Sequence, residues 1–398
     1  MQAQNKDRPS AEWIASMRGQ FQTEREIDRV LTRKLERRAG PGFAPLALST
    51  LVSGLQAMLR SRLDRPFNIK EARWLCGGAS KLQMAFTLEW QRPGVGFERT
   101  PMVLRMEPAE SIVETSRLRE FQLLRAFEGV IPVPTTFWCD VDAEFLPYPA
   151  LIYGFSAGVT KPSTASSGVT GLGTQLTPAV RAQLAPQFVQ HLVAIHRHDF
   201  TKSELTAFDM PAPGTTQCAE WGINWWDRVW EEDCDEEVPL MRVASAWLRR
   251  NIPVLDRVSV VHSDYRLGNF LFTEHDMRIS AWLDWELGRL GDRHQDLAWT
   301  TSRAFGSVDV NGDFLVCGLM PEKEFLEAYQ RASGLSVNPR TMHWYKAYNS
   351  YCIGVLILAT SYRIARNGKT HQDVLVTWLI GIGGMIVDEL RSLIEQGN

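Results

Sequence analysis

The sequence predicts an α+β fold of two lobes, in which a small β-rich N-terminal lobe precedes a larger helical C-terminal lobe. Between residues 81 and 155 several short stretches have the hydrophobic pattern of strands, whereas from about residue 160 the pattern is mostly helical. The length of 398 residues also favours two lobes or domains. The predicted organisation is a helical N-terminal extension over 1–65, a first lobe over 66–157 and a second lobe over 158–398.

Strict alternation marks the first strand of the N-terminal lobe. Polar or small residues at 83, 85, 87 and 89 separate five hydrophobic ones, Leu82, Met84, Phe86, Leu88 and Trp90. This period of two predicts a half-buried strand. A turn at 91–96 and a Pro-rich connection at 131–134 separate the remaining elements. The full expectation for this lobe is one helix over 111–128 and strands over 81–90, 101–106, 136–139 and 150–155.

The second lobe reads as mostly helical, with short strands only near 258–284. Two apolar stretches, 351–360 and 374–387, are shorter than the roughly 18 residues of a membrane span, so we expect buried helices and no membrane association. The net charge of −3 gives no basic field for a nucleic acid. A polar N-terminus without a secretory signal and six scattered cysteines favour a cytoplasmic protein with reduced thiols.

The strongest chemical signal lies between residues 260 and 299. Two strand-like runs deliver Asp264 and Asn269, five residues apart, and Asp284, twenty residues beyond Asp264. This pattern suits phosphoryl transfer, in which one Asp accepts a proton from, or orients, an attacking hydroxyl group. The amide and the later carboxylate offer the hard oxygen ligands that magnesium prefers, and they would hold it against the ATP phosphates.

These residues resemble the aminoglycoside phosphotransferase-like family, relatives of protein kinases. His262-Ser263-Asp264 with Asn269 resembles the H-G-D-x-x-x-x-N loop of that family, with Ser263 in place of glycine. Asp284-Trp285-Glu286 resembles its metal-binding segment, and residues 291–298 resemble its G-D-P-x-x-D-L-A segment. Other segments, such as Val103-Leu104-Arg105, resemble sequences of one subgroup of the family, whose domains are found alone or fused to acyl-CoA dehydrogenases. The resemblance implies a protein-kinase-like fold, with His262 bracing the catalytic loop and Glu286 assisting the metal site.

The N-terminal lobe supplies the expected ATP half of the site. Gly77 and Gly78 lie in a turn with Ser80, where backbone amides can approach phosphate. Arg105 stands where a kinase has its strand lysine, with Glu120 as its expected helical partner and Glu114 as a second candidate. The resemblance also implies that backbone groups in a hinge bind adenine, and the residues chosen there are Gly154, Phe155 and Ser156.

Three features leave alternatives open. The acidic run 231–237 can attract a cationic substrate or, as we favour, form a solvated helix face. The tryptophans between 221 and 230 can line a substrate pocket or pack in a core. Asp292 and Asp296 can touch substrate or metal, although we expect Asp296 to cap a helix because it precedes an apolar run.

Together these observations predict an enzyme that uses ATP and Mg2+ to phosphorylate a hydroxyl group of a small molecule. The subgroup resemblance implies a hydroxyacyl-type acceptor. One alternative is an aminoglycoside, other antibiotic or choline-like acceptor, and an alternative of another class is a nucleotide-binding scaffold without catalysis. The sequence does not choose between ATP and GTP, and it does not indicate an oligomeric state.

Overall fold

Five antiparallel strands form the sheet of the N-terminal lobe, in the order β1-β2-β3-β5-β4. The computed structural model describes residues 6–75, 80–163 and 173–397. The β2–β3 hairpin keeps an unbroken register from Leu82 opposite Met106 to Arg92 opposite Gly96, so β3 begins earlier than predicted. The strands are β1 (Asn68–Trp74), β2 (Leu82–Arg92), β3 (Gly96–Met106), β4 (Thr136–Asp140) and β5 (Ala150–Gly154).

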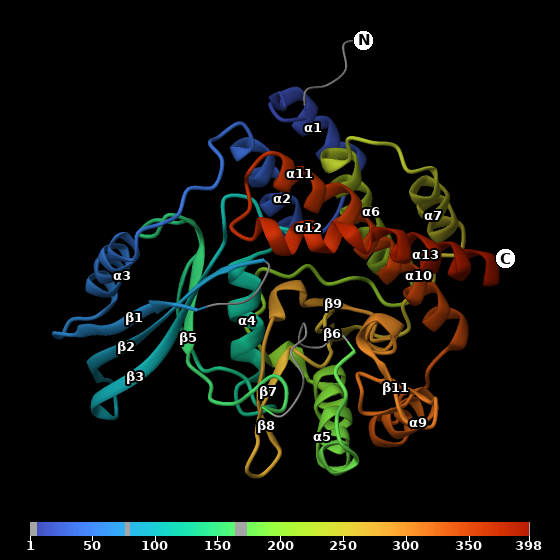
Figure 1. Ribbon diagram of the computed structural model, residues 1–398. Helices are drawn as coiled ribbons and strands as arrows, with labels where there is room; N and C mark the ends of the chain where they lie inside the picture. Colours follow the sequence, from blue (N-terminus) through green and yellow to red (C-terminus); the bar gives the residue numbers. More distant parts are fainter. Residues whose placement is uncertain (1–5, 76–79, 164–172, 398) are drawn as a thin grey trace.

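The N-terminal extension divides between the two lobes. Helix α3 (Leu48–Arg62) covers one face of the sheet, where Leu51 and Leu55 pack in a separate core with Met84 and Leu104. Helices α1 (Ala11–Gln20) and α2 (Arg25–Arg37) instead lie against the helical lobe (Figure 1). The other face of the sheet meets α4 (Arg117–Phe127), which belongs to the large core shared with the C-terminal lobe.

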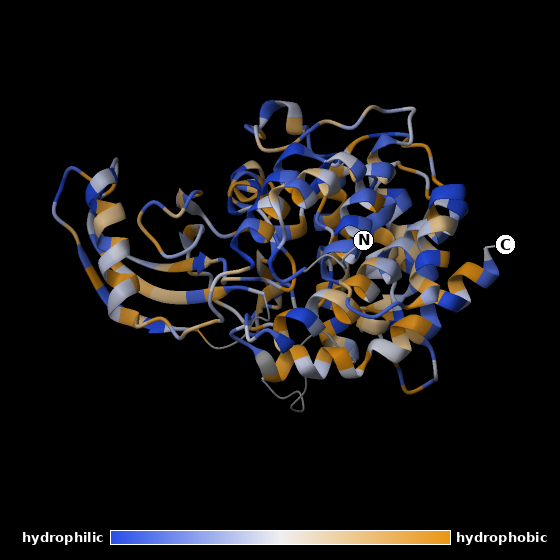
Figure 2. Ribbon diagram, turned by 90° about the horizontal axis from the view of Figure 1, so that it is seen from above, coloured by the Kyte–Doolittle hydropathy of each residue, from blue (hydrophilic) through white to orange (hydrophobic). Residues whose placement is uncertain are grey.

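The C-terminal lobe is helical, as predicted, and its helices carry hydrophilic and hydrophobic stripes (Figure 2). Its first helices are α5 (Pro178–Arg197), α6 (Gln217–Asp233), α7 (Pro239–Arg250) and α8 (His294–Thr300). The later ones are α9 (Glu322–Ser333), α10 (Pro339–Val355), α11 (Tyr362–Arg366), α12 (Asp373–Gly381) and α13 (Gly383–Gln396), with a π-helical turn at Leu356–Ser361.

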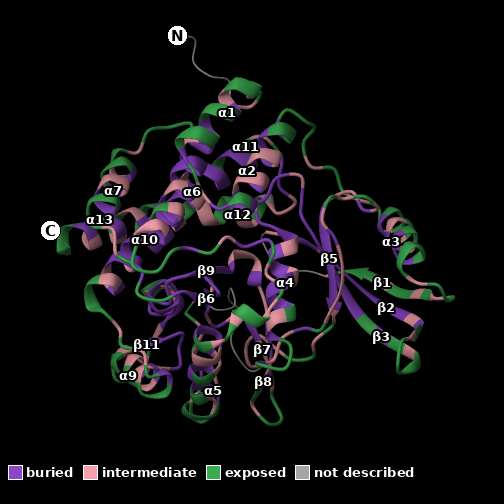
Figure 3. Ribbon diagram, turned by 180° about the vertical axis from the view of Figure 1, so that it is seen from behind, coloured by how far each residue is buried: buried purple, intermediate pink, exposed green. Residues whose placement is uncertain are grey.

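Two short hairpin-like pairs carry the chemical segment. Strand β6 (Ser259–Val261) pairs with β9 (Arg289–Gly291), and β7 (Phe270–Thr273) pairs with β8 (Arg278–Trp282). Strands β6 and β9 are buried in the middle of the molecule (Figure 3), so the loops that leave them rest on a rigid base. Strands also occur beyond the predicted range, at β9 and in a small sheet of β10 (Ser307–Val308), β11 (Phe314–Val316) and β12 (Met320–Pro321).

The prediction that 374–387 forms a buried helix is wrong. The stretch divides into α12 and α13, and its side chains Val374, Trp378 and Met385 are exposed by 80%, 44% and 72%. The helical run is interrupted at Ile382, between two glycines, and glycine lowers helix stability. Among the described residues, no helix has the length and apolar composition needed to cross a membrane.

Candidate active site

Asp264 lies in the loop between β6 and β7, and three donors fix its carboxylate. Arg266 Nε and Trp299 Nε1 each lie 2.7 Å from Oδ1, and Asn269 Nδ2 donates to Oδ2 at 2.5 Å. Burial raises the pKa of Asp264 despite the neighbouring Arg266 guanidinium. A carboxylate that is held in one orientation with a raised pKa is suited to accept a proton from a hydroxyl group.

His262 joins this loop to the segment that carries Asp284. Its Nε2 donates to the carbonyl of Leu283 at 3.0 Å, and its Nδ1 accepts from the Asp264 N–H at 3.3 Å. Burial lowers the pKa of His262, so the ring is neutral with the proton on Nε2. The Leu283 N–H in turn donates to the carbonyl of Asn269 at 2.8 Å. These bonds bring Asn269 and Asp284, two of the predicted metal ligands, to neighbouring positions.

Asp296 is the residue that shapes the catalytic loop. Its carboxylate is fully buried and accepts from the N–H groups of His262 at 2.8 Å and Ser263 at 2.7 Å, and from His196 Nε2 at 3.0 Å. Ser263 has a φ of +66°, a left-handed conformation that favours glycine. The two charge-assisted bonds therefore hold Ser263 in a backbone geometry that a serine otherwise avoids.

The prediction that Asp296 caps a helix is wrong. Helix α8 begins at His294, so Asp296 lies inside its first turn and points back to the catalytic loop. Asp292 lies one residue before the N-cap, Arg293. Its Oδ1 accepts from the His294 N–H at 2.9 Å and lies 2.6 Å from His294 Nδ1. Both aspartates accept hydrogen bonds from backbone N–H groups.

Asp284 also has a left-handed backbone, with a φ of +58°, and its side chain is 38% exposed. One oxygen, Oδ1, lies 2.6 Å from Arg105 Nη1. Within the described part of the chain, the second oxygen accepts no hydrogen bond. Trp285 next to it is fully buried, which anchors the segment and leaves Asp284 at the edge of the site.

Arg105 and Glu120 meet as predicted for a strand cation and a helical carboxylate. Arg105 Nε, on β3, lies 3.3 Å from Glu120 Oε1, on α4. The second candidate, Glu114, instead accepts from the Ser111 N–H at 3.0 Å. Burial, with a contribution from Glu107, raises the pKa of Glu114 to about 7, so this carboxyl is partly protonated near neutral pH.

Glu286 lies in a cluster of cations instead of beside Asp264 and Asn269. Ser80 Oγ donates to its Oε1 at 2.7 Å. Its Oε2 lies 3.0 Å from Lys81 Nζ, 3.1 Å from Arg117 Nη2 and 3.3 Å from Arg105 Nη2. Burial disfavours the charged carboxylate, but these cations outweigh burial and hold the pKa of Glu286 below its usual range.

The predicted adenine-binding residues follow β5. The N–H groups of Gly154 and Phe155 already donate to Thr135 at 2.8 Å and Pro101 at 2.9 Å, so both belong to the sheet. Phe155 is 45% exposed, and its ring is free to contact a base. Gly77 and Gly78 lie outside the described residues.

Sequence reasoning missed several residues of the site. Lys81 and Arg117 are fully buried in the ion cluster, and Arg266 and Trp299 hold Asp264. Lys81 follows the Gly-Gly turn directly, which is the one signal that would have indicated it. Trp299 lacks a local signal because its partner Asp264 lies 35 residues earlier, whereas Arg266 lies two residues from Asp264 and Arg117 three residues from Glu120.

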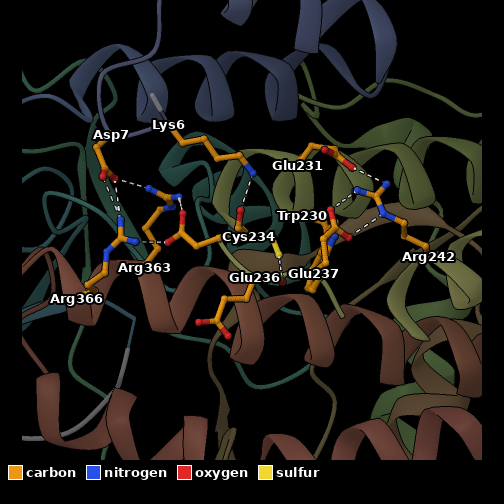
Figure 4. A pocket seen from close by; sticks show the side chains of 11 residues that line it. Lys6, Asp7, Trp230, Glu231, Cys234, Glu236, Glu237, Arg242, Arg363 and Arg366 are labelled. Carbon is orange, nitrogen blue, oxygen red and sulfur yellow. Dashed lines mark hydrogen bonds and ion pairs between the residues drawn. The ribbon is translucent and has the colours of Figure 1, made fainter. Parts of the chain in front are cut away.

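Part of the acidic run is buried. Glu232 lies 2.8 Å from Lys34 Nζ, and Asp233 Oδ1 lies 2.5 Å from Arg38 Nη2, both out of contact with solvent. The preferred reading of a solvated helix face is therefore wrong for these two residues. The exposed members pair with arginines around a hollow of about 360 Å³ (Figure 4), where Asp235 meets Arg363 and Arg366, and Glu237 meets Arg242.

Two of the tryptophans approach the catalytic loop. Trp225 and Trp226 are buried and stacked, with ring centroids 5.2 Å apart. Both line a narrow hollow together with Ser263, Trp299 and Tyr348. They thus contribute to the core and also form an aromatic wall next to the residue that precedes Asp264.

The donor set fits magnesium. Asn269 and Asp284 offer one amide and one carboxylate at neighbouring positions, and hard oxygen ligands of this kind suit Mg2+ bound together with substrate phosphates. Across the described ranges there is no group of three or more His, Cys, Asp or Glu residues that forms an all-protein metal cage. Such a sparse set is typical of magnesium that a nucleotide brings with it.

Comparison with known proteins gives a family match. The family described as phosphotransferase enzyme family matches residues 90–348. The chain is 25% identical to mouse acyl-CoA dehydrogenase family member 10 over 50% of its length and 24% identical to rat acyl-CoA dehydrogenase family member 11 over 69%. The matched regions span only 18% and 35% of those two relatives. The predicted resemblance, including the acyl-CoA dehydrogenase subgroup, is confirmed.

Solved structures give the same fold. A Ralstonia eutropha structure described as an aminoglycoside phosphotransferase superimposes with a TM-score of 0.62 at 20% identity, covering 87% of this chain and 98% of that one. Plasmodium vivax ethanolamine kinase superimposes with a TM-score of 0.51 at 13% identity, covering 93% and 97%. The predicted kinase-like α+β fold is therefore confirmed.

Proposed function

The chain belongs to the phosphotransferase enzyme family, and from that premise we propose that it transfers the γ-phosphate of ATP to a hydroxyl group of a small molecule. The observation that carries the proposal is the meeting of four groups from distant segments. Asp264 and Asn269 share one loop, Asp284 lies beside that loop, and Arg105 reaches Asp284 from the other lobe. Phosphoryl transfer needs a hydroxyl-orienting carboxylate, metal ligands and a phosphate-binding cation in one place.

Asp264 orients the acceptor hydroxyl and takes up its proton. Because Arg266 and Trp299 hold Oδ1 and Asn269 holds Oδ2, the carboxylate has little freedom to turn, and the hydroxyl meets it in one direction. The raised pKa of Asp264 lies closer to neutral pH than that of an ordinary aspartate, which makes the carboxylate a stronger base. Positioning of this kind and electrostatic stabilisation supply most of the rate gain in phosphoryl transfer.

Asn269 and Asp284 are the residues that would hold magnesium. When bound, the ion neutralises charge on the phosphate oxygens. Asp284 retains one oxygen without a protein partner among the described residues, and its exposed edge is open to the site. Arg105 faces three carboxylates, those of Glu120, Asp284 and Glu286. If Arg105 turns its Nη1 from Asp284 to a phosphate, the guanidinium remains paired with the other two.

We propose a hydroxyacyl-type acceptor ahead of an aminoglycoside. The support is that two relatives carry acyl-CoA dehydrogenase in their names. A polycationic antibiotic needs carboxylates at its site. Four residues of the acidic run, Glu232, Asp233, Asp235 and Glu237, are instead paired with lysines and arginines.

The direct test is a screen of acceptors by ADP release, with hydroxy acids and hydroxyacyl-CoA esters against aminoglycosides and ethanolamine. Asp264→Ala should abolish turnover and leave nucleotide binding intact, whereas Asp284→Ala should remove the magnesium-dependent part of nucleotide binding. Asp388→Asn, whose side chain is 76% exposed on α13, is the matched control and should change neither. If the protein binds nucleotide but releases no ADP with any acceptor, and does not hydrolyse ATP even slowly, the result would favour the non-catalytic scaffold.

A further inference from the structure

We propose that Glu286 is a positioning residue that ties the segment after the Gly-Gly turn to the metal segment, and that it is not itself a magnesium ligand. The inference rests on the proposed function and reassigns one residue of that site. We call the contact of Ser80 and Lys81 with Glu286 the interlobe latch. It joins the start of β2 in the N-terminal lobe to the segment before β9 in the C-terminal lobe.

Lys81 is fixed within the N-terminal lobe before it reaches Glu286. Its Nζ donates to Ser111 Oγ at 2.8 Å and to the Val113 carbonyl at 3.0 Å, and lies 3.0 Å from Glu107 Oε2. The side chain is completely buried, so it does not sample other positions as a surface lysine does. Across the described residues, Glu286 is the one acidic partner of Lys81 from the C-terminal lobe.

Glu286 and Asp284 differ in the protein contacts that each would lose on binding a metal. Asp284 is 38% exposed and has one cationic partner, whereas Glu286 is 10% exposed and has Ser80 on one oxygen and cations on the other. Release of Glu286 to a metal would leave the buried Lys81 and Arg117 short of a counter-charge. Loss of one partner from a buried ion pair leaves the other charge uncompensated, which is strongly destabilising.

The charge balance of the cluster leads to the same assignment. Three cations, Lys81, Arg105 and Arg117, lie in contact with three carboxylates, Glu107, Glu120 and Glu286. The set is neutral without Asp284, so the charge of Asp284 is available for magnesium. Glu286 then holds Ser80 and Lys81 near the segment that carries Asp284, two residues before it.

The test compares Glu286→Gln, Lys81→Met, their double variant and Asp284→Asn, first without nucleotide or metal. Hydrogen exchange should accelerate around residues 80–83 and 285–288 in Glu286→Gln and in Lys81→Met, and remain near wild type in Asp284→Asn. Hydrogen exchange in the double variant should be no faster than in the faster-exchanging of the two single variants, because both substitutions break the same contact. Unchanged exchange in both single variants would overturn the latch, whether or not the protein proves to be a phosphotransferase.

The second readout is the magnesium dependence of ADP binding, measured by calorimetry. Its midpoint is the magnesium concentration at which ADP binding is half-maximal. Asp284→Asn should raise this midpoint strongly, whereas Glu286→Gln and Lys81→Met should weaken ADP binding to a similar extent with little change in the midpoint. A midpoint raised by Glu286→Gln as far as by Asp284→Asn, with Lys81→Met unaffected, would make Glu286 a metal ligand. Lys81→Arg should restore wild-type exchange, and it keeps the test decisive if Lys81→Met fails to fold.

Discussion

Replacement of Asp296 by asparagine tests whether one buried carboxylate holds the catalytic loop. The carboxylate uses Oδ1 for the Ser263 N–H and Oδ2 for the His262 N–H and His196 Nε2. An asparagine of the same shape has one oxygen, so its NH2 group must face one of these donors. The change loses a charge-assisted hydrogen bond and leaves a buried N–H unsatisfied, which together destabilise by about 3 kcal/mol.

The assays for Asp296→Asn are urea unfolding and steady-state kinetics. We expect the free energy of unfolding to fall by about 3 kcal/mol, and kcat to fall about tenfold or more, since about 1.4 kcal/mol of lost positioning corresponds to tenfold in rate. KM for ATP should change little because Asp296 contacts the loop and not the nucleotide lobe. The control, Asp256→Asn, removes a half-exposed partner of Arg293 next to α8 and should cost below about 1 kcal/mol. Equal stability and kcat in Asp296→Asn and wild type would refute the reasoning.

Three further changes probe the same region. Arg266→Met removes the cation beside Asp264, so the pKa of Asp264 should rise further and the acid limb of the kcat profile should move to higher pH; a limb that stays in place would remove Asp264 as the titrating group. Ser263→Gly should leave activity intact and raise stability by up to about 1 kcal/mol, measured by urea unfolding, because glycine tolerates the φ of +66°. Burial lowers the pKa of His191 to about 4, below its ordinary 6.5, so the unfolded chain binds more protons than the folded one in that window. The free energy of unfolding should therefore fall as pH drops from 6.5 toward 4. In His191→Gln, whose side chain can still accept from Trp282, about 2 kcal/mol of this loss at pH 4.5 should be absent, which urea unfolding at several pH values measures.

The sequence was sufficient for the parts of the site that are local. Asp264 and Asn269 are five residues apart in one loop, and their side chains meet in the structure, as a shared role predicts. Alternation predicted β2 because its hairpin partner follows after a short turn. The Arg105–Glu120 pair was also predictable, since the strand and helix that carry it are consecutive through one loop.

What the sequence did not predict depends on residues far apart in the chain. Ser80 and Glu286 are separated by 206 positions, and no periodicity links them. The burial of Glu232 and Asp233 was missed because a run of acidic residues normally indicates a solvated surface. Their cationic partners, Lys34 in α2 and Arg38 directly after it, lie almost 200 residues earlier. Asp296 was misassigned for the same reason, since its hydrogen-bond partners lie more than thirty residues earlier.

Helix α4 connects the two halves of the site through a single face. Glu120 and Phe127 are seven residues apart, two helical turns, so they lie on the same side of the helix. Glu120 binds Arg105, while the Phe127 ring stacks on Trp285 with centroids 4.7 Å apart. Trp285 separates Asp284 from Glu286 in the chain and also packs on His262, at 4.5 Å. Helix α4 therefore contacts both Arg105, the proposed phosphate-binding arginine, and Trp285, in the proposed metal segment, so a displacement of α4 would act on both.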